Sequence, residues 1–339
     1  MKRLMLTATA VAVVAVAGEA MARDQIRIVG SSTVFPFSTA VAEQFGRAGK
    51  FKTPVVESTG TGGGFKLFCA GVGETHPDIT NASRAIKKSE YEECVKNGVK
   101  DITEVKIGFD GIVVAESKGA RQLDLKIEQI WLALAKEVPK DGKLVANPYR
   151  TWRDIDPSLP ADKIEVLGPP PTSGTRDAFV ELVMDVGCQK FPEIKALEAK
   201  AQRAACQTIR EDGAYIDAGE NDNLIVQKLK ANPKAMGIFG YSFLDQNRDA
   251  LIAHKINGVE PTYDNISSGK YAVSRSLYFY VKNAHAAVVP GIREFVAEFT
   301  SDKAMGPDGY LADKGLIALP DKMREEVRNR AANLEPLTM

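Results

Sequence analysis

The sequence predicts an α/β protein of two domains with a ligand cleft between them. In the N-terminal third, short apolar runs alternate with helical patterns, an order typical of a mainly parallel sheet covered by helices. The chain has 339 residues, which is enough for two domains of roughly 100–200 residues each. No Pro/Gly/Ser-rich linker separates two halves. We therefore expect the chain to cross between the domains on short β segments that act as a hinge.

Residues 1–22 are predicted to be a secretory signal peptide. Two basic residues precede a short apolar run, and Ala20-Met21-Ala22 fits the A-x-A cleavage pattern, which puts the mature start at Arg23. The apolar run is shorter than the roughly 20 residues that a membrane-spanning helix needs. No cysteine follows it, so a lipid-anchored start is not indicated. We expect the mature chain to be exported and soluble.

The charge balance excludes whole classes of partner. The sequence has 44 Lys and Arg residues against 44 Asp and Glu residues, and removal of the signal peptide leaves the chain near neutral. Such a chain offers no broad basic field for nucleic acid or for an acidic membrane surface. Any anion must therefore be recognised by local groups.

The four cysteines fall into two pairs that are close in sequence, Cys69 with Cys94 and Cys188 with Cys206. In an oxidising compartment an even number of cysteines favours disulfides. Three connectivities are possible, and we prefer the two local ones. A metal site is the competing interpretation, but the sequence has no C-x-x-C and only three histidines. We expect neither a metal nor a cofactor.

The expected elements follow in chain order. An N-terminal strand ends at Gly30, and a helix continues from about Thr33 to Arg47. Residues 118–153 read as helical and irregular. Further strands are expected in TPVVEST, PDIT, two short runs of EVKIGFDGIVVAES, KIEVLG, KAMGIFG and SLYFYVKN. Further helices are expected in GGGFKLFCAG, from near Lys88, in IEQIWLALAKEV, after TSGT, in DNLIVQKLKAN and as two segments of PGIREFVAEFTSDKAMGPDGYLADKG.

Four loops share small hydroxyl residues and a position between a strand and a helix, and three of them also contain glycine. The four loops are residues 30–35, 58–65, 81–86 and 172–179. In open α/β sheets, ligands bind beyond the carboxyl ends of the strands, where such loops gather. Hydroxyls and helix-start N–H groups together can bind a tetrahedral oxyanion without a metal. Taken alone, each loop is better explained by ordinary helix capping or a turn.

Catalytic motifs are poorly supported. The sequence has no G-x-S-x-G elbow and no H-E-x-x-H helix, and GTGGG is neither a Walker A loop nor a dinucleotide loop. Glu220 and Asp222 could be imagined as an acid/base pair, but Asn and Asp there also suit a loop before a helix. We therefore expect a binding protein and keep a secreted phosphatase or other hydrolase as the alternative.

In their order and spacing, the loop motifs resemble the periplasmic phosphate-binding subunit of the ABC phosphate importer, the PstS family, and are closest to its SphX-like branch. The motifs are GSSTVFPFSTAVAEQF, GTGGGFKLFCAG, DITNASRAIKKSE, SGTRDAF and GIFGYSFL. The resemblance implies a type II periplasmic-binding-protein fold, with two α/β domains joined by a two-strand hinge. It implies residues 23–115 and 277–339 as domain I and residues 116–276 as domain II.

The resemblance also implies a phosphate site supplied by all four loops. Its residues would be Ser32, Thr33, the N–H groups of Val34 and Phe35, Thr61, Gly62, Ser83, Arg84, Ser173, Gly174 and Thr175.

Two departures from the family pattern bear on specificity. Some members have an aspartate at the position of Arg84, and that aspartate accepts the proton of phosphate and helps to reject sulfate. An arginine often stands at the position of Pro169. We expect Arg84 to supply the missing cation, whereas the acceptor is unassigned. Arg176, Arg210 and Asp222 are candidate substitutes.

The function implied by the resemblance is capture of inorganic phosphate in the periplasm and its delivery to the membrane permease of an ABC importer. The protein would act as a monomer, without nucleic acid. The alternatives are the same fold binding another oxyanion, such as sulfate, arsenate or an organic phosphate, and a sensor that presents its closed form to a membrane receptor.

Overall fold

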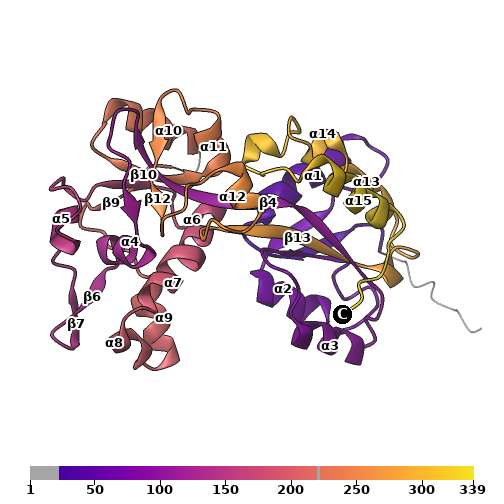
Figure 1. The fold of residues 1–339 in the computed structure, drawn as a ribbon. Coiled ribbons are helices and arrows are strands. Elements are labelled where there is room, and N and C mark those ends of the chain that lie inside the picture. Colours follow the sequence, from indigo (N-terminus) through magenta and orange to yellow (C-terminus); the bar gives the residue numbers. More distant parts are fainter. Residues whose placement is uncertain (1–22, 220–221) are drawn as a thin grey trace, which may run out of the picture.

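The computed structural model describes residues 23–219 and 222–339, so the predicted signal peptide, residues 1–22, and Glu220 lie outside the described residues. Figure 1 shows two lobes of mixed helix and sheet, with the long strands β4 and β13 lying between them. One lobe carries α1 to α3 and α13 to α15, and the other carries α4 to α11.

The strands come from the whole length of the described chain. They are β1 (Arg27–Gly30), β2 (Val55–Ser58), β3 (Ile79–Ala82), β4 (Ile102–Ser117), β5 (Asp124–Leu125), β6 (Glu137–Lys140), β7 (Lys143–Ala146), β8 (Val166–Gly168), β9 (Tyr215–Asp217), β10 (Met236–Gly240), β11 (Leu251–Ala253), β12 (Lys255–Ile256) and β13 (Ser274–Lys282).

The helices are mostly short. They are α1 (Phe35–Arg47), α2 (Thr61–Phe68), α3 (Lys88–Lys96), α4 (Ile127–Leu134), α5 (Trp152–Ile155), α6 (Gly174–Phe179), the π-helix η1 (Val180–Met184), α7 (Asp185–Cys188), α8 (Pro192–Lys195), α9 (Ala199–Gln207), α10 (Asp222–Ala231), α11 (Tyr241–Asp245), α12 (Tyr263–Ser267), η2 (Asn283–His285), α13 (Ile292–Phe299), α14 (Asp302–Met305), η3 (Ala312–Lys314) and α15 (Asp321–Ala332).

Nine strands of the described residues form one continuous sheet. The order is β2-β1-β3-β13-β4-β10-β8-β9, and β11 also pairs with β4. The strands β2, β1 and β3 are parallel, as the sequence predicts, whereas β13 is antiparallel to both β3 and β4. In the other lobe β8 is parallel to β9 and β10, and β10 is antiparallel to β4.

Strand β4 corrects one expectation, because the two predicted runs are a single strand of 16 residues. Its first part pairs with β13 as far as Gly111, and its last part, from Ile112, pairs with β10 and β11. Gly108 and Gly111 lie inside this strand. In the structure Gly108 lets another segment approach closely, since a Cβ there would lie 2.6 Å from the carbonyl oxygen of Ile317.

The region expected to be helical and irregular contains a hairpin that the sequence analysis missed. Helix α4 ends at Leu134, and β6 and β7 then pair in antiparallel fashion around Asp141-Gly142. Asp141 has φ 51° and Gly142 has φ 76°, as a two-residue type I′ turn requires. The Asp-Gly dipeptide was the signal for this turn.

The buried apolar side chains form separate cores that fit the predicted domains. The largest cluster draws nearly all its members from Phe109 to Val273. The second combines residues from Ile26 to Ile107 with residues from Leu277 to Leu334. The largest cluster already includes Phe109 and Ile112, which the predicted limits place in domain I, so the limits at residues 115 and 277 stay a prediction.

Both expected disulfides are confirmed. Cys69 is bonded to Cys94 and links the end of α2 to α3, and Cys188 is bonded to Cys206 and links α7 to α9. Within the described ranges, we find no helix with the length and apolar character needed to cross a membrane.

The packing at Gly108 gives a testable prediction. Gly108→Ala should lower the free energy of unfolding by about 1–3 kcal/mol, because the added Cβ meets backbone rather than a flexible side chain. Urea denaturation followed by circular dichroism measures the change. The matched control is Gly63→Ala in α2, where the added Cβ lies 3.5 Å from its neighbour and should not lower stability. Equal stability of the two variants would contradict the close packing at Gly108.

Candidate anion-binding site

A cavity of about 600 Å³ lies between the lobes. Both lobes contribute to its wall, which also includes residues of β4 and of η3. The lining residues are Ser32, Thr33, Phe35, Pro36, Phe37, Ser58, Asp110, Thr172, Ser173, Gly174, Thr175, Asp222, Asn223, Gly240, Phe243, Asp313, Lys314 and Gly315.

Three of the predicted loops meet at one edge of the sheet, at the carboxyl ends of the parallel strands β2, β1 and β3. The N–H of Ser31 donates to the carbonyl of Asn81, and the N–H of Thr59 donates to the carbonyl of Gly30, both at 2.9 Å. Helix α2 approaches so closely that a Cβ on Gly64 would lie 2.5 Å from the Cα of Gly30. The glycines of these loops therefore allow backbone contact between neighbouring loops.

The fourth loop reaches the same place from the other lobe. A Cβ on Gly174 would lie 3.0 Å from the carbonyl oxygen of Ser32 and 3.2 Å from the Cα of Thr33. Ser173 caps α6, and its hydroxyl accepts the N–H of Thr175 at 3.2 Å. Because that hydroxyl acts as an acceptor toward the helix, its own proton is available to a further acceptor.

Six of the eleven predicted binding residues line the cavity. They are Ser32, Thr33, Phe35, Ser173, Gly174 and Thr175. The other five do not contribute to its wall. They are Val34, Thr61, Gly62, Ser83 and Arg84.

The N–H groups predicted for anion binding at the first loop already have partners inside the loop. The N–H of Phe35 donates to the carbonyl oxygen of Ser31 at 3.0 Å, and the N–H of Val34 is 3.4 Å from the Ser31 hydroxyl. The Thr61 and Ser83 hydroxyls lie 3.0 Å apart, and the N–H of Ser83 donates to Thr61 Oγ1. These two residues hold the second and third loops together.

Arg84 is engaged by a carboxylate. Its two terminal nitrogens donate to the two oxygens of Glu90, each at 2.8 Å. These bonds raise the pKa of Arg84; burial raises the pKa of Glu90, but the bonds from Arg84 and from the N–H of Lys87 outweigh burial and leave it lowered. The predicted role of Arg84 as the anion's cation therefore requires its guanidinium to share or to leave this pair.

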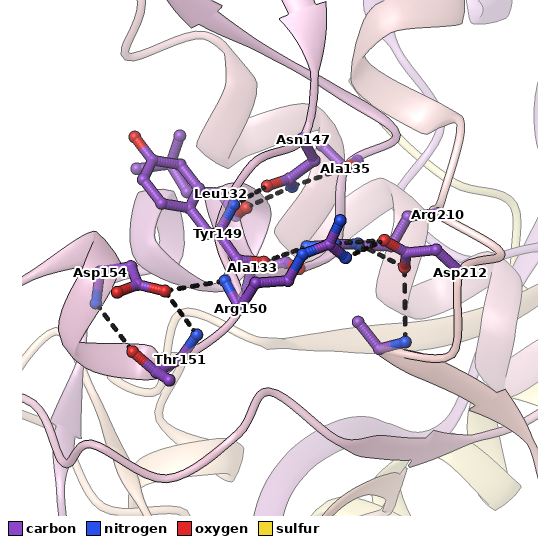
Figure 2. Close-up of polar contacts among 11 residues, drawn as sticks. Leu132, Ala133, Ala135, Asn147, Tyr149, Arg150, Thr151, Asp154, Arg210 and Asp212 are labelled. Atoms are coloured by element: carbon purple, nitrogen blue, oxygen red, sulfur yellow. Dashed lines mark hydrogen bonds and ion pairs between the residues drawn. The ribbon is translucent and has the colours of Figure 1, made fainter.

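The other two candidate arginines do not line the cavity either. Arg176 donates to the carbonyl oxygen of Pro169 at 3.1 Å and lies over the Tyr215 ring. Arg210 is 3% exposed and is paired with Asp212, and Figure 2 shows its guanidinium reaching backbone carbonyl groups.

Figure 2 also shows what this second arginine does. Arg210 donates to the carbonyl oxygen of Ala133, and Asn147 donates to those of Leu132 and Ala135. These carbonyls belong to the last turn of α4 and the residue after it, which have no partner within the helix. Arg210 is therefore a helix C-terminal cap, and the proposal that it replaces a binding-site cation is wrong.

The sequence analysis missed three charged residues on the cavity wall, Asp110 of β4 and Asp313 and Lys314 of η3, and it missed Arg275, which contacts Asp110. Asp110 on β4 lines the cavity and lies directly opposite Arg275 on β13 in the strand pairing. Arg275 Nε lies 3.6 Å from Asp110 Oδ2, and its Nη1 is paired with Glu181 of η1. Asp222, which the sequence did suggest, lines the cavity and accepts the N–H of Gly240 at 2.9 Å.

Like Asp222, Asp110 is a buried acid of the site. Among the described residues, its Oδ2 has no hydrogen-bond partner. Burial raises the pKa of Asp110, and the nearby charge of Arg275 offsets this only in part. Since Glu181 shares the same guanidinium, two carboxylates compete for one cation. The cavity therefore holds a carboxyl group that is able to accept a hydrogen bond.

The described residues contain no group of three or more His, Cys, Asp and Glu side chains that could hold a metal ion. The arrangement instead offers hydroxyl donors from both lobes, backbone N–H groups near Gly174, and a carboxylate. This combination suits a tetrahedral oxyanion that itself carries a proton.

The sequence is similar to those of known binding proteins. Residues 15–303 match the PBP superfamily domain. The phosphate-binding protein PstS of Staphylococcus saprophyticus is 31% identical over 306 residues, which cover 89% of this chain and 82% of that protein. The chain belongs to the PstS family. The protein SphX of Synechococcus elongatus is 33% identical, over 86% of this chain and 77% of that protein.

Solved structures show the same fold. A possible phosphate-binding protein from Planctomyces limnophilus has a TM-score of 0.73 and 30% identity, over 91% of this chain and 98% of that one. An ABC-type phosphate transport receptor from Vibrio cholerae has a TM-score of 0.57 at 20% identity, over 87% of this chain and 100% of that one. This chain therefore has the type II periplasmic-binding-protein fold.

The environment of Asp110 predicts how stability depends on pH. Folding raises the pKa of Asp110 and so favours its protonated form. Below the pKa of an unfolded carboxyl, Asp110 therefore does not lower the free energy of unfolding. As the pH rises through the folded pKa, the ionised carboxylate lowers that free energy. We expect Asp110→Asn to raise the free energy of unfolding of the anion-free protein at pH 8 by on the order of 1 kcal/mol. The gain should shrink as pH falls toward 4. Urea titrations across this range measure it, and a gain independent of pH would contradict the assignment.

Proposed function

We propose that this protein is an exported solute-binding protein that captures inorganic phosphate in the cavity between its lobes and delivers it to the membrane permease of an ABC importer. The observation that carries the proposal is the meeting of the Thr33 and Ser173 loops, one from each lobe, at one cavity. Relatives named as phosphate-binding proteins over most of the chain support the same ligand.

Capture would depend on closure of the two lobes. Hydroxyl groups from Ser32 and Thr33 would bind the anion on one side, and Ser173, Gly174 and Thr175 would bind it on the other. Neither set surrounds a tetrahedral anion alone, so the complete set of hydrogen bonds would form only in the closed state. Many short bonds to an anion would then offset the loss of its hydration.

Membership of the PstS family also supports a proposal for the compartment and the partners of this protein. We propose that it works in the periplasm as a monomer, and that its partners are phosphate and a permease rather than nucleic acid. It would release its ligand unchanged and would not act as an enzyme. The secretory signal predicted in residues 1–22 supports export.

Asp110 is our candidate for the acceptor that Arg84 displaces from its usual family position. At neutral pH phosphate carries at least one proton, whereas sulfate carries none. An ionised Asp110 would accept the hydrogen bond of a P–OH group but would repel a sulfate oxygen. Its place on the cavity wall and its Oδ2, which lacks a hydrogen-bond partner among the described residues, support this role.

Isothermal titration calorimetry tests the function. The purified protein is unfolded, dialysed to remove any bound anion and refolded, and then titrated with phosphate, arsenate and sulfate. We expect one phosphate per chain with a dissociation constant of about 1 μM or lower. Absence of saturable phosphate binding would overturn the proposal. Tighter binding of sulfate than of phosphate would show that sulfate is the transported anion. Hydrolysis of p-nitrophenyl phosphate, resistant to chelators, would support the hydrolase instead.

Asp110→Asn tests the specificity. The amide can donate a hydrogen bond to sulfate, so we expect the ratio of phosphate affinity to sulfate affinity at pH 8 to fall at least about tenfold. Competition titrations measure the ratio. Glu116→Gln, a carboxylate substitution on the same strand but not on the cavity wall, is the matched control and should leave the ratio unchanged. An unchanged ratio in Asp110→Asn would show that another group rejects sulfate.

A further inference from the structure

Arg275 contacts three polar side chains that lie far apart in the sequence. It stands near the start of β13, and its side chain is only 10% exposed. Its Nη2 donates to the Thr33 hydroxyl at 2.6 Å, its Nη1 is paired with Glu181, and its Nε faces Asp110. The guanidinium does not form part of the cavity wall. Arg275 can therefore affect a ligand only through the groups it holds or through its electrostatic field.

The contact with Thr33 determines which way that hydroxyl can act. A threonine hydroxyl has one proton to donate and two lone pairs that accept. Arginine stays protonated and has no acceptor, so Arg275 can only donate and Thr33 Oγ1 can only accept from it. The Thr33 proton must therefore point elsewhere. Since Thr33 lines the cavity, its proton is available for donation to an anion there, although one lone pair also stays available.

The contact with Glu181 extends the connection to the other lobe. Glu181 belongs to η1, which continues directly from α6. The first residue of α6 is Gly174, which touches the backbone of Ser32 and Thr33. One guanidinium therefore joins the hydroxyl of one half of the cavity to the helix that presents the other half.

We propose that Arg275 is a positioning residue of the anion site: it holds the Thr33 hydroxyl as a hydrogen-bond donor toward the bound anion and keeps it in register with the helix that starts at Gly174. This inference rests on the proposed function. A donor bonded to a cation is also more polarised, which strengthens its bond to an anion.

A direct electrostatic effect of Arg275 on the anion is the competing explanation. The two carboxylates that flank the guanidinium, Asp110 and Glu181, oppose its field in the cavity. The two explanations differ in one measurable respect. If Arg275 acts through Thr33, its contribution to phosphate affinity disappears when the Thr33 hydroxyl is removed. If Arg275 acts through its electrostatic field, its contribution to phosphate affinity persists in Thr33→Val.

A double-mutant cycle separates them. Phosphate affinity is measured by calorimetry for the wild type, Arg275→Met, Thr33→Val and the double variant. We expect each single substitution to raise the dissociation constant about tenfold, and the double variant to be within about threefold of the weaker single variant. Effects that multiply to about a hundredfold would overturn the inference, as would Arg275→Met binding phosphate like the wild type.

Controls separate positioning from loss of structure. Arg324 is similarly buried, at 11% exposed, and pairs with Asp302 and Asp321 away from the cavity wall. Arg324→Met should lose thermal stability but keep phosphate affinity, whereas Arg275→Met should lose affinity at temperatures where circular dichroism shows it folded.

Arg275→Lys keeps the cycle usable if Arg275→Met does not fold. Lysine can still donate to the Thr33 hydroxyl but lacks the planar guanidinium group. We therefore expect Arg275→Lys to lower phosphate affinity about threefold when Thr33 is present and not to lower it further in Thr33→Val. A lysine effect of equal size in both backgrounds would contradict positioning. Failure of the wild type itself to bind phosphate would overturn the proposed function, whereas additive variants of a wild type that binds would overturn only this inference.

Discussion

The antiparallel pairing of β4 with β13 is the constraint on which the arrangement of the cavity depends. β4 pairs with β13 along its first part and with β10 and β11 along its last part, so a single strand belongs to the sheets of both lobes. The same register sets Asp110 opposite Arg275 at the cavity. Because the loops that line the cavity follow strands of this sheet, a change in the twist of β4 would move the two halves of the site relative to each other.

Local patterns predicted the loops of the site well. Each loop has small hydroxyls at the end of a strand, three of the four also have glycine, and the structure brings all four loops together. Asp110 and Arg275 could not be found in this way. Each lies in a β-rich run far from the other in sequence, and only the strand register makes them neighbours. The hairpin at Asp141-Gly142 is a different case, since its turn signal was present and was assigned to irregular helix.

The structure changes the account of charge at the site. The sequence analysis assigned the cation to Arg84, because Pro169 occupies the position where relatives often have arginine. Arg84 is held by Glu90, so its role as the cation stays a prediction, and the cavity wall includes both Asp110 and Lys314. Recognition in such a cavity depends on matching donors and acceptors more than on net positive charge. A near-neutral chain is compatible with that chemistry, and a protonated oxyanion satisfies both kinds of group.

A crystal structure of the protein with phosphate bound at pH 7.5 tests this account most directly. We predict one phosphate between the lobes, with oxygens within hydrogen-bond distance of the Thr33 hydroxyl, of the Ser173–Thr175 segment and of the Asp110 carboxylate. Arg275 should still donate to Thr33 in that structure. A phosphate bound by one lobe alone, or bound with Asp110 out of hydrogen-bond reach and Arg275 detached from Thr33, would contradict the account.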